Sequence, residues 1–249
     1  MKRLIALLLF VAPAAFAGDV TLAPAVIMLR GEVGQSTTQT LALTNNTSQT
    51  MNFTLAAEDV VIQDGRRTYA PAGKIAGSIA ATAVFSRPSV SIAAGHREAV
   101  TVTLTIPPDA RHRAVVVLFR GTDRIKNGTA TMTASLGSLL TFTLSNDAVM
   151  HADALVVQPQ TTTSNLAVAQ TCTNAGHEPI VAKGMLAVLG ANGEVAGKSA
   201  LKPHRLLPGE RAELGAEYAA ELAPGHYRVL VTYDYEGGAL TQSAEVDVR

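Results

Sequence analysis

The 249-residue sequence contains one cysteine, no tryptophan and few aromatic residues, which make up 4% of the chain. A single cysteine cannot form an intramolecular disulfide, and it excludes a zinc or iron–sulfur site built from several thiolates. An excess of basic charge, which would indicate a nucleic-acid-binding protein, is also missing, because 20 Lys and Arg balance 20 Asp and Glu. Glycine (20) and proline (11) occur at ordinary frequency, so neither a collagen-like chain nor a disordered linker is expected.

Catalytic signatures are missing as well. The sequence has no G-x-S-x-G nucleophile elbow, no phosphate-binding G-x-x-x-x-G-K-[ST], no H-E-x-x-H and no G-x-G-x-x-G. A local metal site is also unsupported, since no two of the six histidines stand two or four positions apart. These histidines are His96, His112, His151, His177, His204 and His226. We therefore expect no enzymatic activity, no catalytic residue, no metal site and no cofactor.

The N-terminus has the pattern of an export signal. Lys2 and Arg3 precede the apolar run from Leu4 to Val11, and an A-x-A pattern ends at Ala17. This pattern predicts a signal peptide over residues 1–17, cleavage before Gly18 and a periplasmic location. The apolar run is shorter than the ~20 residues that a spanning helix needs, and no later segment is long enough either.

The remainder of the sequence has the alternation of β-strands. Short runs rich in Val, Thr, Ile and Leu are separated by turn signals such as Asp64-Gly65, Asn127-Gly128 and Asn192-Gly193. We expect strands within the following ranges: Thr40–Thr44, Met51–Leu55, Val100–Ile106, Ala114–Phe119 and Thr129–Leu144. No long stretch shows a helical period with caps, so the sequence predicts an all-β fold of two tandem immunoglobulin-like antiparallel sandwiches.

The expected domains are residues 18–147 and 148–249, divided after the cluster Ser145-Asn146-Asp147. In the second domain, Tyr227 follows a Pro-Gly corner, which resembles the tyrosine corner of such sandwiches and predicts a hydroxyl bonded back to the backbone. Cys172 is expected as a buried thiol within a strand, with intermolecular pairing as the alternative. The Ala- and Gly-rich segment Ala70–Ala83 is expected to be a crossing loop with a short helical turn.

Several turn-and-strand motifs carry a family resemblance. The first block has a strand from Val20 towards Gly31, a Thr44-Asn45 turn, a Pro88–Gly95 segment and the alternating strand that ends at Pro107. The second block has an N-x-G-x-x-P pattern (Asn174, Gly176, Pro179) and an L-x-P-G-x-Y pattern that ends at Tyr227. This order of motifs resembles the periplasmic pilus-assembly chaperones of the PapD-like superfamily, of which the chain would be a divergent member.

The resemblance implies donor-strand complementation, in which the last strand of the first domain is lent to an incomplete subunit. Its expected partners are a secreted or fimbrial protein subunit and an outer-membrane usher, and no nucleic acid. On the strand that we expect over Thr129–Leu144, the candidate partner-binding residues are Met132, Ala134 and Leu136, and the alternative is that they too face the domain's own core. Leu140, Phe142 and Leu144, which share their parity, are expected to face the domain's own core.

The chain departs from the family pattern at two positions. Family members carry an arginine on the first strand and a lysine on the last strand of the first domain, which together clamp the subunit's C-terminal carboxylate. These positions fall near Pro24 and Thr141, neither of which offers a charged donor, and Arg30 lies six residues further on. A second hypothesis therefore stays open: a non-catalytic structural or adhesive module of the cell envelope.

Overall fold

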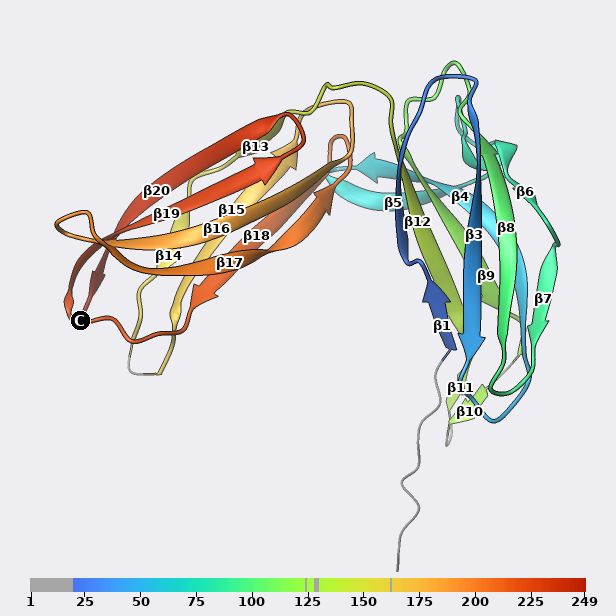
Figure 1. The fold of residues 1–249 in the computed structure, drawn as a ribbon, viewed down its shortest axis with the longest axis horizontal. Helices are drawn as coiled ribbons and strands as arrows, with labels where there is room; N and C mark the ends of the chain where they lie inside the picture. The colour runs from blue at the N-terminus through green and yellow to red at the C-terminus, as the bar shows by residue number, and fades with distance from the viewer. Residues whose placement is uncertain (1–19, 124, 128–129, 162) are drawn as a thin grey trace, which may run out of the picture.

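The computed structural model describes residues 20–123, 125–127, 130–161 and 163–249. The predicted signal peptide, Met1–Ala17, lies outside the described residues. The described chain forms strands in two β-sandwiches, which are joined at one end and set at an angle to each other (Figure 1). No α-helix occurs in the part that the structure describes, and a 3₁₀ turn, η1 (Ala80–Thr82), lies within the expected crossing loop. The expected all-β, two-sandwich fold is confirmed.

The first sandwich pairs a four-stranded sheet with a six-stranded sheet. The four-stranded sheet has the order β1-β3-β8-β6, and all its pairs are antiparallel. In the other sheet, β2-β12-β9-β4-β5, strand β7 also pairs with β4. The bounds of the first sheet are β1 (Val20–Ala23), β3 (Ser36–Asn45), β6 (Val84–Phe85) and β8 (Arg97–Thr105). Those of the second are β2 (Val26–Arg30), β4 (Met51–Gln63), β5 (Arg66–Pro71), β7 (Ser89–Ile92), β9 (Ala114–Gly121) and β12 (Ser135–Thr143).

The first segment of the chain changes sheets at Pro24, which follows a cis peptide bond. Before it, β1 pairs with β3; after it, β2 pairs with β12 in parallel, with Leu139 opposite Val26 and Thr143 opposite Arg30. Proline has no N–H to contribute to a ladder, so it fits the break between the two sheets. This parallel pair departs from the purely antiparallel arrangement that we expected, and it leaves β2 and β12 neighbours at one edge of the sandwich.

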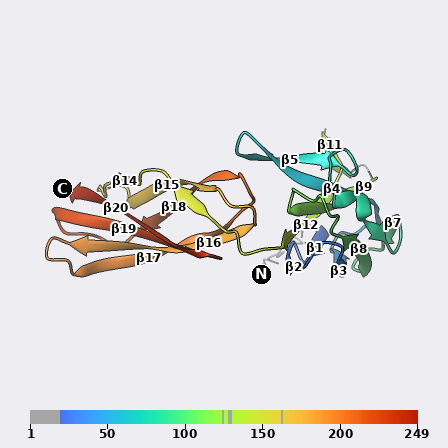
Figure 2. The same cartoon turned by 90° about the horizontal axis from the view of Figure 1, so that it is seen from above.

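The second sandwich pairs two four-stranded sheets, seen from above in Figure 2. In one sheet, β13 and β14 pair with one edge of β15 and β18 pairs with the other, and the second sheet has the order β17-β16-β19-β20. Their bounds are β13 (Met150–Ala152), β14 (Val156–Gln158), β15 (Leu166–Asn174), β16 (Ile180–Gly190), β17 (Val195–Leu206), β18 (Arg211–Tyr218), β19 (Gly225–Tyr235) and β20 (Gly238–Val248). The predicted division at residues 147 and 148 lies between β12 and β13, and it stays a prediction.

Alternating aliphatic side chains fill both sandwiches. In β8, Val100, Val102 and Leu104 are buried and the threonines between them are half-buried, as strict period-two alternation predicts. Phe119 on β9 and Phe142 on β12 are fully buried in the first core. The second core is built around further buried side chains: Leu166, Ile180, Val188, Val229, Val231 and Tyr233. Each Å² of apolar surface that is removed from water stabilises the folded state by about 25 cal/mol, so such cores can form without disulfides.

The same asparagine device fixes one turn in each sandwich. Asn45, at the end of β3, donates from Nδ2 to the carbonyl oxygens of Gln49 (2.7 Å) and Ile92 (2.9 Å). Asn174, at the end of β15, donates in the same way to Glu178 (2.8 Å) and Leu206 (3.0 Å). Both side chains are fully buried. Each asparagine therefore ties the end of its strand to a second segment far along the chain.

Two further expectations about the second sandwich are confirmed. The Tyr227 hydroxyl donates to the Ala223 carbonyl at 2.8 Å, which is the backbone bond of a tyrosine corner. Cys172 lies on β15, fully buried, where burial raises the pKa of its thiol to about 11. A buried neutral thiol packs as a small apolar group.

One strand prediction is wrong in its extent. The segment expected as a single strand over Thr129–Leu144 is divided into β11 (Ala130–Met132) and β12, because β11 turns away to pair with β10 (Ile125–Asn127). The alternation that we read as one strand therefore spans two. The predicted Asn127-Gly128 turn includes a position outside the described residues.

Candidate functional site

Polar side chains hold the two sandwiches together at the long β4–β5 hairpin. The guanidinium of Arg67 on β5 forms an ion pair with Glu210 of the second sandwich, with Nε and Oε1 2.8 Å apart. At the hairpin's tip, the carbonyl of Gly65 accepts from the backbone N–H of Arg211 at 2.9 Å. The hairpin therefore reaches across the joint and fixes one side of it.

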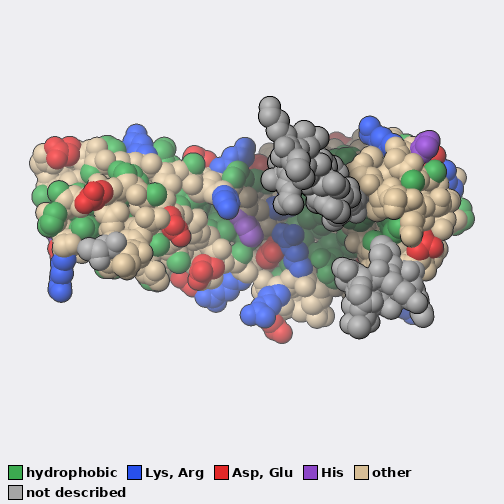
Figure 3. Space-filling view, turned by 90° about the horizontal axis from the view of Figure 1, so that it is seen from below, with side chains coloured by type: hydrophobic (Ala, Val, Ile, Leu, Met, Phe, Trp, Pro, Cys, Tyr) green, Lys and Arg blue, Asp and Glu red, His purple; other side chains and the backbone are tan. Residues whose placement is uncertain are grey.

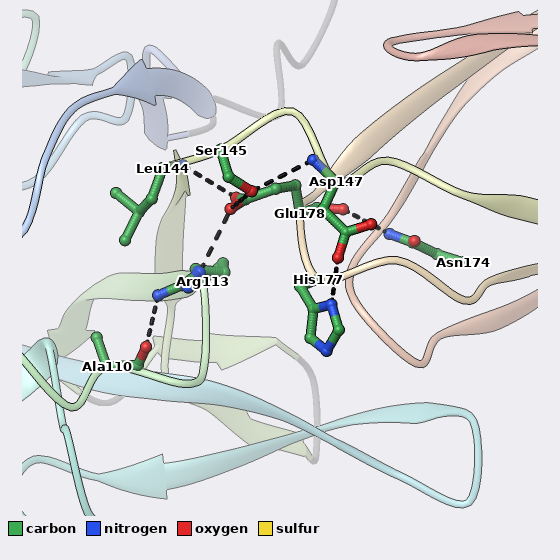
Figure 4. A network of polar contacts seen from close by, with 8 residues as sticks. All are labelled: Ala110, Arg113, Leu144, Ser145, Asp147, Asn174, His177 and Glu178. Atoms are coloured by element: carbon green, nitrogen blue, oxygen red, sulfur yellow. Dashed lines mark hydrogen bonds and ion pairs between the residues drawn. The ribbon is translucent and has the colours of Figure 1, made fainter.

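The other side of the joint centres on Glu178, whose side chain is 2% exposed (Figure 4). Its Oε2 accepts from the backbone N–H of Leu144 at 3.0 Å, and its Oε1 accepts from the Ser145 hydroxyl at 2.8 Å. Nε of Arg113, from the first sandwich, lies 3.9 Å from Oε2, within ion-pair but not hydrogen-bond distance. One buried carboxylate thus binds the end of the first sandwich and the linker that follows it.

A recess between the sandwiches, here called the cleft, carries both apolar and basic side chains (Figure 3). Three adjoining hollows of about 190, 460 and 430 Å³ make it up; the first two share Arg205, and the last two share Arg67 and Leu139. Its basic residues are Arg30, Arg66, Arg67, His204, Arg205 and Arg211, and its acidic residues are Glu58, Glu210 and Glu236. The cleft is therefore net positive.

Arg205, on β17 of the second sandwich, contacts the last strand of the first sandwich. Its Nη1 donates to the Thr141 hydroxyl at 3.0 Å, so a guanidinium from one sandwich lies beside β12 of the other. Burial, followed by the nearby Arg67 cation, lowers the pKa of Arg205 from its ordinary value. Among the described residues, no carboxylate lies within 4 Å of this guanidinium.

Pro24 and Thr141 themselves offer no charged donor, and the cation that lies beside Thr141 belongs to Arg205 of the second sandwich. Arg30 also lines the hollow that contains Thr141, and its Nη1 donates to Asn146 Oδ1 at 3.1 Å. Sequence reasoning missed Arg205 because it lies 64 positions after Thr141 and belongs to the other sandwich. Only the angle between the sandwiches brings the two together.

The candidate partner-binding residues lie at or next to the start of β12. Ala134 and Leu136 are half-buried and pack against the first core, whereas Leu140 and Phe142 are fully buried within it. The core assignment of Leu140 and Phe142 is confirmed, and Leu144 packs against the same core. Met132 ends β11 and pairs with Ile125, so the structure does not bring it onto one strand with the other two. Their role in partner binding stays a prediction.

The first half of β12 is an open sheet edge. Pairing with β2 begins at Leu139, so residues 135–138 have β9 on one side and no partner strand, among the strands described, on the other. Ser138 donates from its hydroxyl to the Pro24 carbonyl at 2.8 Å, which marks the point where β2 departs. Such an edge presents unpaired backbone donors and acceptors to another chain.

Within the part of the chain that the structure places, no group of three or more His, Cys, Asp and Glu residues could hold a metal ion. Two histidines form surface contacts with carboxylates: His177 with Asp147, and His226 with Asp247 and Glu245. The described ranges contain no helix that is long and apolar enough to cross a membrane.

Comparison with known proteins gives structural likenesses only. No family model matches the sequence, and no curated protein matches it either. Among solved structures, the class 5 fimbriae chaperone CfaA is 12% identical, with 93% of this chain and 99% of that chain covered and a TM-score of 0.45.

Two further likenesses have the same character. The E. coli chaperone DraB is 14% identical, with coverages of 92% and 98% and a TM-score of 0.44. A chain of the CsuC–CsuE chaperone–tip adhesion subunit complex of Acinetobacter baumannii is 10% identical, with coverages of 91% and 97% and a TM-score of 0.45. At these identities and TM-scores the likeness by itself assigns no function to this chain.

Proposed function

We propose that this protein is an exported, non-catalytic chaperone-like protein that binds a secreted or fimbrial subunit by β-strand addition to the open edge of β12. The observation that carries the proposal is this edge, where residues 135–138 lack a partner strand among the described residues. Export would depend on residues 1–17, with the periplasm as the place of action. An outer-membrane usher is a further proposed partner.

The backbone of β12 is oriented for such pairing. Because N–H and C=O groups alternate in direction along a strand, those of Ser135 and Gly137 point to the same side as those of Leu139. The N–H of Leu139 already donates to the Ala25 carbonyl at 2.9 Å, which fixes that side as the β2 edge. A partner strand on residues 135–138 would therefore extend the sheet in line with β2, and main-chain hydrogen bonds would supply affinity.

The side chains of Ala134 and Leu136 support the same proposal. Both are only half-buried at the open end of the first core, whereas the residues further along β12 with the same parity are fully buried. A partner strand can cover this exposed end of the apolar row. Specificity in strand addition comes from such alternate side chains filling pockets, while the backbone bonds are independent of sequence.

Arg205 offers a second contact for the same partner. Its guanidinium lies half-buried in a net positive cleft, bonds the Thr141 hydroxyl and has no carboxylate within 4 Å among the described residues. Charge-assisted hydrogen bonds to carboxylates are about twice as strong as neutral ones. We propose that Arg205, helped by Arg30, binds a carboxylate of the partner subunit, in place of the arginine and lysine that the resemblance implies.

The test is capture of subunits from periplasmic extract by the purified protein and two variants. Wild-type protein should recover one secreted or fimbrial subunit in stoichiometric amount, and Leu136→Glu should recover little of it, because a carboxylate cannot enter an apolar pocket. Arg205→Ala should weaken capture about tenfold, since a charge-assisted bond contributes roughly 1.5 kcal/mol. Val195→Glu, which changes an exposed valine on the second sandwich, is the matched control.

Recovery of only polysaccharide or cell-wall material would favour a structural or adhesive module instead. Circular dichroism of each variant shows whether it is folded. A Leu136→Glu variant that unfolds would assign Leu136 to the core and remove it from the proposed binding surface.

A further inference from the structure

The six-stranded sheet of the first sandwich is apolar on its outer face as well as its inner one. Sandwich sheets usually turn polar side chains outwards, yet Val116, Leu118 and Leu139 face outwards here, and Tyr69 beside them is 58% exposed. They line a hollow of about 430 Å³, here called the trough, which forms one end of the cleft. The full lining is Glu58, Val60, Arg67, Tyr69, Val116, Leu118, Gly137 and Leu139.

The trough has no uncompensated charge at its rim. Glu58 is paired with Arg120, and Arg67 is paired with Glu210. At the end nearest the second sandwich, Leu207 packs against Val60 and Val116 and covers them. The remaining surface, around Leu118 and Gly137, has no such cover among the described residues. A neutral apolar group fits this uncovered part better than a charged one.

At the edge of the sheet, the side chains of Val116 and Leu118 lie over Gly137 and occupy the space that a Cβ would take. Gly137 lies on β12 opposite Leu118 of β9, and Leu118 in turn lies opposite Ala56 of β4, so a leucine stands between two small residues in one cross-strand row. A Cβ on residue 137 would lie 2.9 Å from Val116 Cγ2 and 3.4 Å from Leu118 Cδ2. The φ of Gly137 is not positive, so backbone conformation does not demand glycine here. A glycine inside a strand often marks a close approach by another chain.

The row continues into the open edge of β12. A residue placed opposite Gly137 on an added strand would share its face of the sheet, because directly paired residues point the same way. Because Leu118 lies over Gly137 and is not covered by Leu207, a large group on that residue can contact the Leu118 side chain. Aromatic residues opposite strand glycines stabilise sheets in this way.

We infer that the subunit strand which pairs with β12 carries a large apolar residue, preferably aromatic, at the position opposite Gly137, and that this residue fills the trough. The inference rests on the proposed function and adds a sequence requirement for the partner strand. Both faces of β12 then contribute to partner specificity. Ala134 and Leu136 contact side chains on one face of the added strand, and the trough contacts the residue on the other face.

Synthetic peptides test the inference on the full chain. The probes are two nine-residue strands of alternating Thr and Val that differ only at the central outward position, Phe in one and Ala in the other. The Phe peptide should bind about tenfold more tightly, the ratio that corresponds to roughly 1.4 kcal/mol. Titration calorimetry gives the affinities, and amide NMR shifts at residues 135–138 locate the binding.

Two protein variants complete a double-mutant cycle. Leu118→Ala removes the contact, and Gly137→Thr displaces the Val116 and Leu118 side chains that lie over residue 137, so each should reduce the advantage of Phe over Ala to less than threefold. Val195→Ala, distant on the second sandwich, should leave the tenfold ratio unchanged.

Equal affinities of the two peptides for the wild-type protein, with shifts at residues 135–138, would overturn the trough inference and leave strand addition standing. A tenfold ratio that persists in Leu118→Ala and Gly137→Thr would also overturn it, since the Phe would then lie elsewhere. Binding of neither peptide would overturn strand addition at β12 together with the inference.

Discussion

Replacing Glu178 by alanine tests how the two sandwiches are held. The carboxylate accepts hydrogen bonds from the Leu144 N–H and the Ser145 hydroxyl, and it lies 3.9 Å from Nε of Arg113. Hydrogen bonds to a charged group contribute about 1.5–3 kcal/mol each, so two of them amount to roughly 3–6 kcal/mol. Removing one member of a buried ion pair costs about 3–5 kcal/mol, because the partner's charge is left without compensation. We expect Glu178→Ala to lower the free energy of unfolding by about 4 kcal/mol.

Glu178→Gln separates the charge from the hydrogen bonds. The amide oxygen can still accept from Leu144, and the amide N–H₂ can donate to the Ser145 oxygen, because a hydroxyl both donates and accepts. Only the charge-assisted part is then lost, so we expect a cost of about 1–2 kcal/mol. The order Ala, then Gln, then wild type in increasing stability follows from the geometry of the two bonds.

Urea unfolding measures these differences, and small-angle scattering reports whether the sandwiches keep their mutual angle. Glu217→Ala is the matched control, because Glu217 is exposed and accepts a single bond from Asn165 at 3.1 Å; it should change stability by less than about 0.5 kcal/mol. A Glu178→Ala protein as stable as Glu217→Ala, with an unchanged scattering curve, would refute the role of this carboxylate in the joint.

Three further predictions concern single side chains. Burial raises the pKa of Cys172 to about 11, so the native thiol should react slowly with DTNB at pH 8 and rapidly in urea; fast reaction in the native state would contradict its burial. The hydrogen bond to Asp247 raises the pKa of His226 above 6.5, so its stabilising contribution is full below pH 6.5 and is lost as the pH rises through the folded-state value. Asp247→Asn should therefore lower the NMR titration midpoint of His226, and an unchanged midpoint would remove Asp247 as the cause. Asn45→Ala should cost about 3 kcal/mol, because the backbone carbonyls of Gln49 and Ile92 lose a buried donor; thermal unfolding within 1 kcal/mol of wild type would contradict this.

Local patterns predicted much of the fold. Alternation in Val100–Ile106 identified a half-buried strand, and the Pro-Gly corner before Tyr227 predicted the bond that its hydroxyl makes. Asn45 and Asn174 were recognised only as parts of turn motifs, although each is the centre of a buried network of hydrogen bonds. Burial depends on segments brought in from elsewhere, which a turn motif does not specify.

The candidate site was less predictable, because its residues come from both sandwiches. Nothing near Arg205 in the sequence indicates that it bonds Thr141, since that contact depends on the angle set by Glu178 and Arg67. The sequence also does not show where β12 begins. The alternation continues from Met132 through Leu136, although Met132 belongs to β11, which pairs with β10 and not with the neighbours of β12. Period-two patterns give the face of a side chain, and they do not give the partner of a strand.

The turn from Asn174 to Glu178 both stabilises the second sandwich and attaches it to the first. Asn174 binds the carbonyl of Glu178 inside the second sandwich, and the carboxylate of that same Glu178 binds the linker from the first. A nascent or damaged chain whose second half has not folded cannot present this carboxylate in place, so Arg205 and Thr141 do not meet. The hollow that Thr141 and Arg205 line is therefore complete only when both sandwiches are folded.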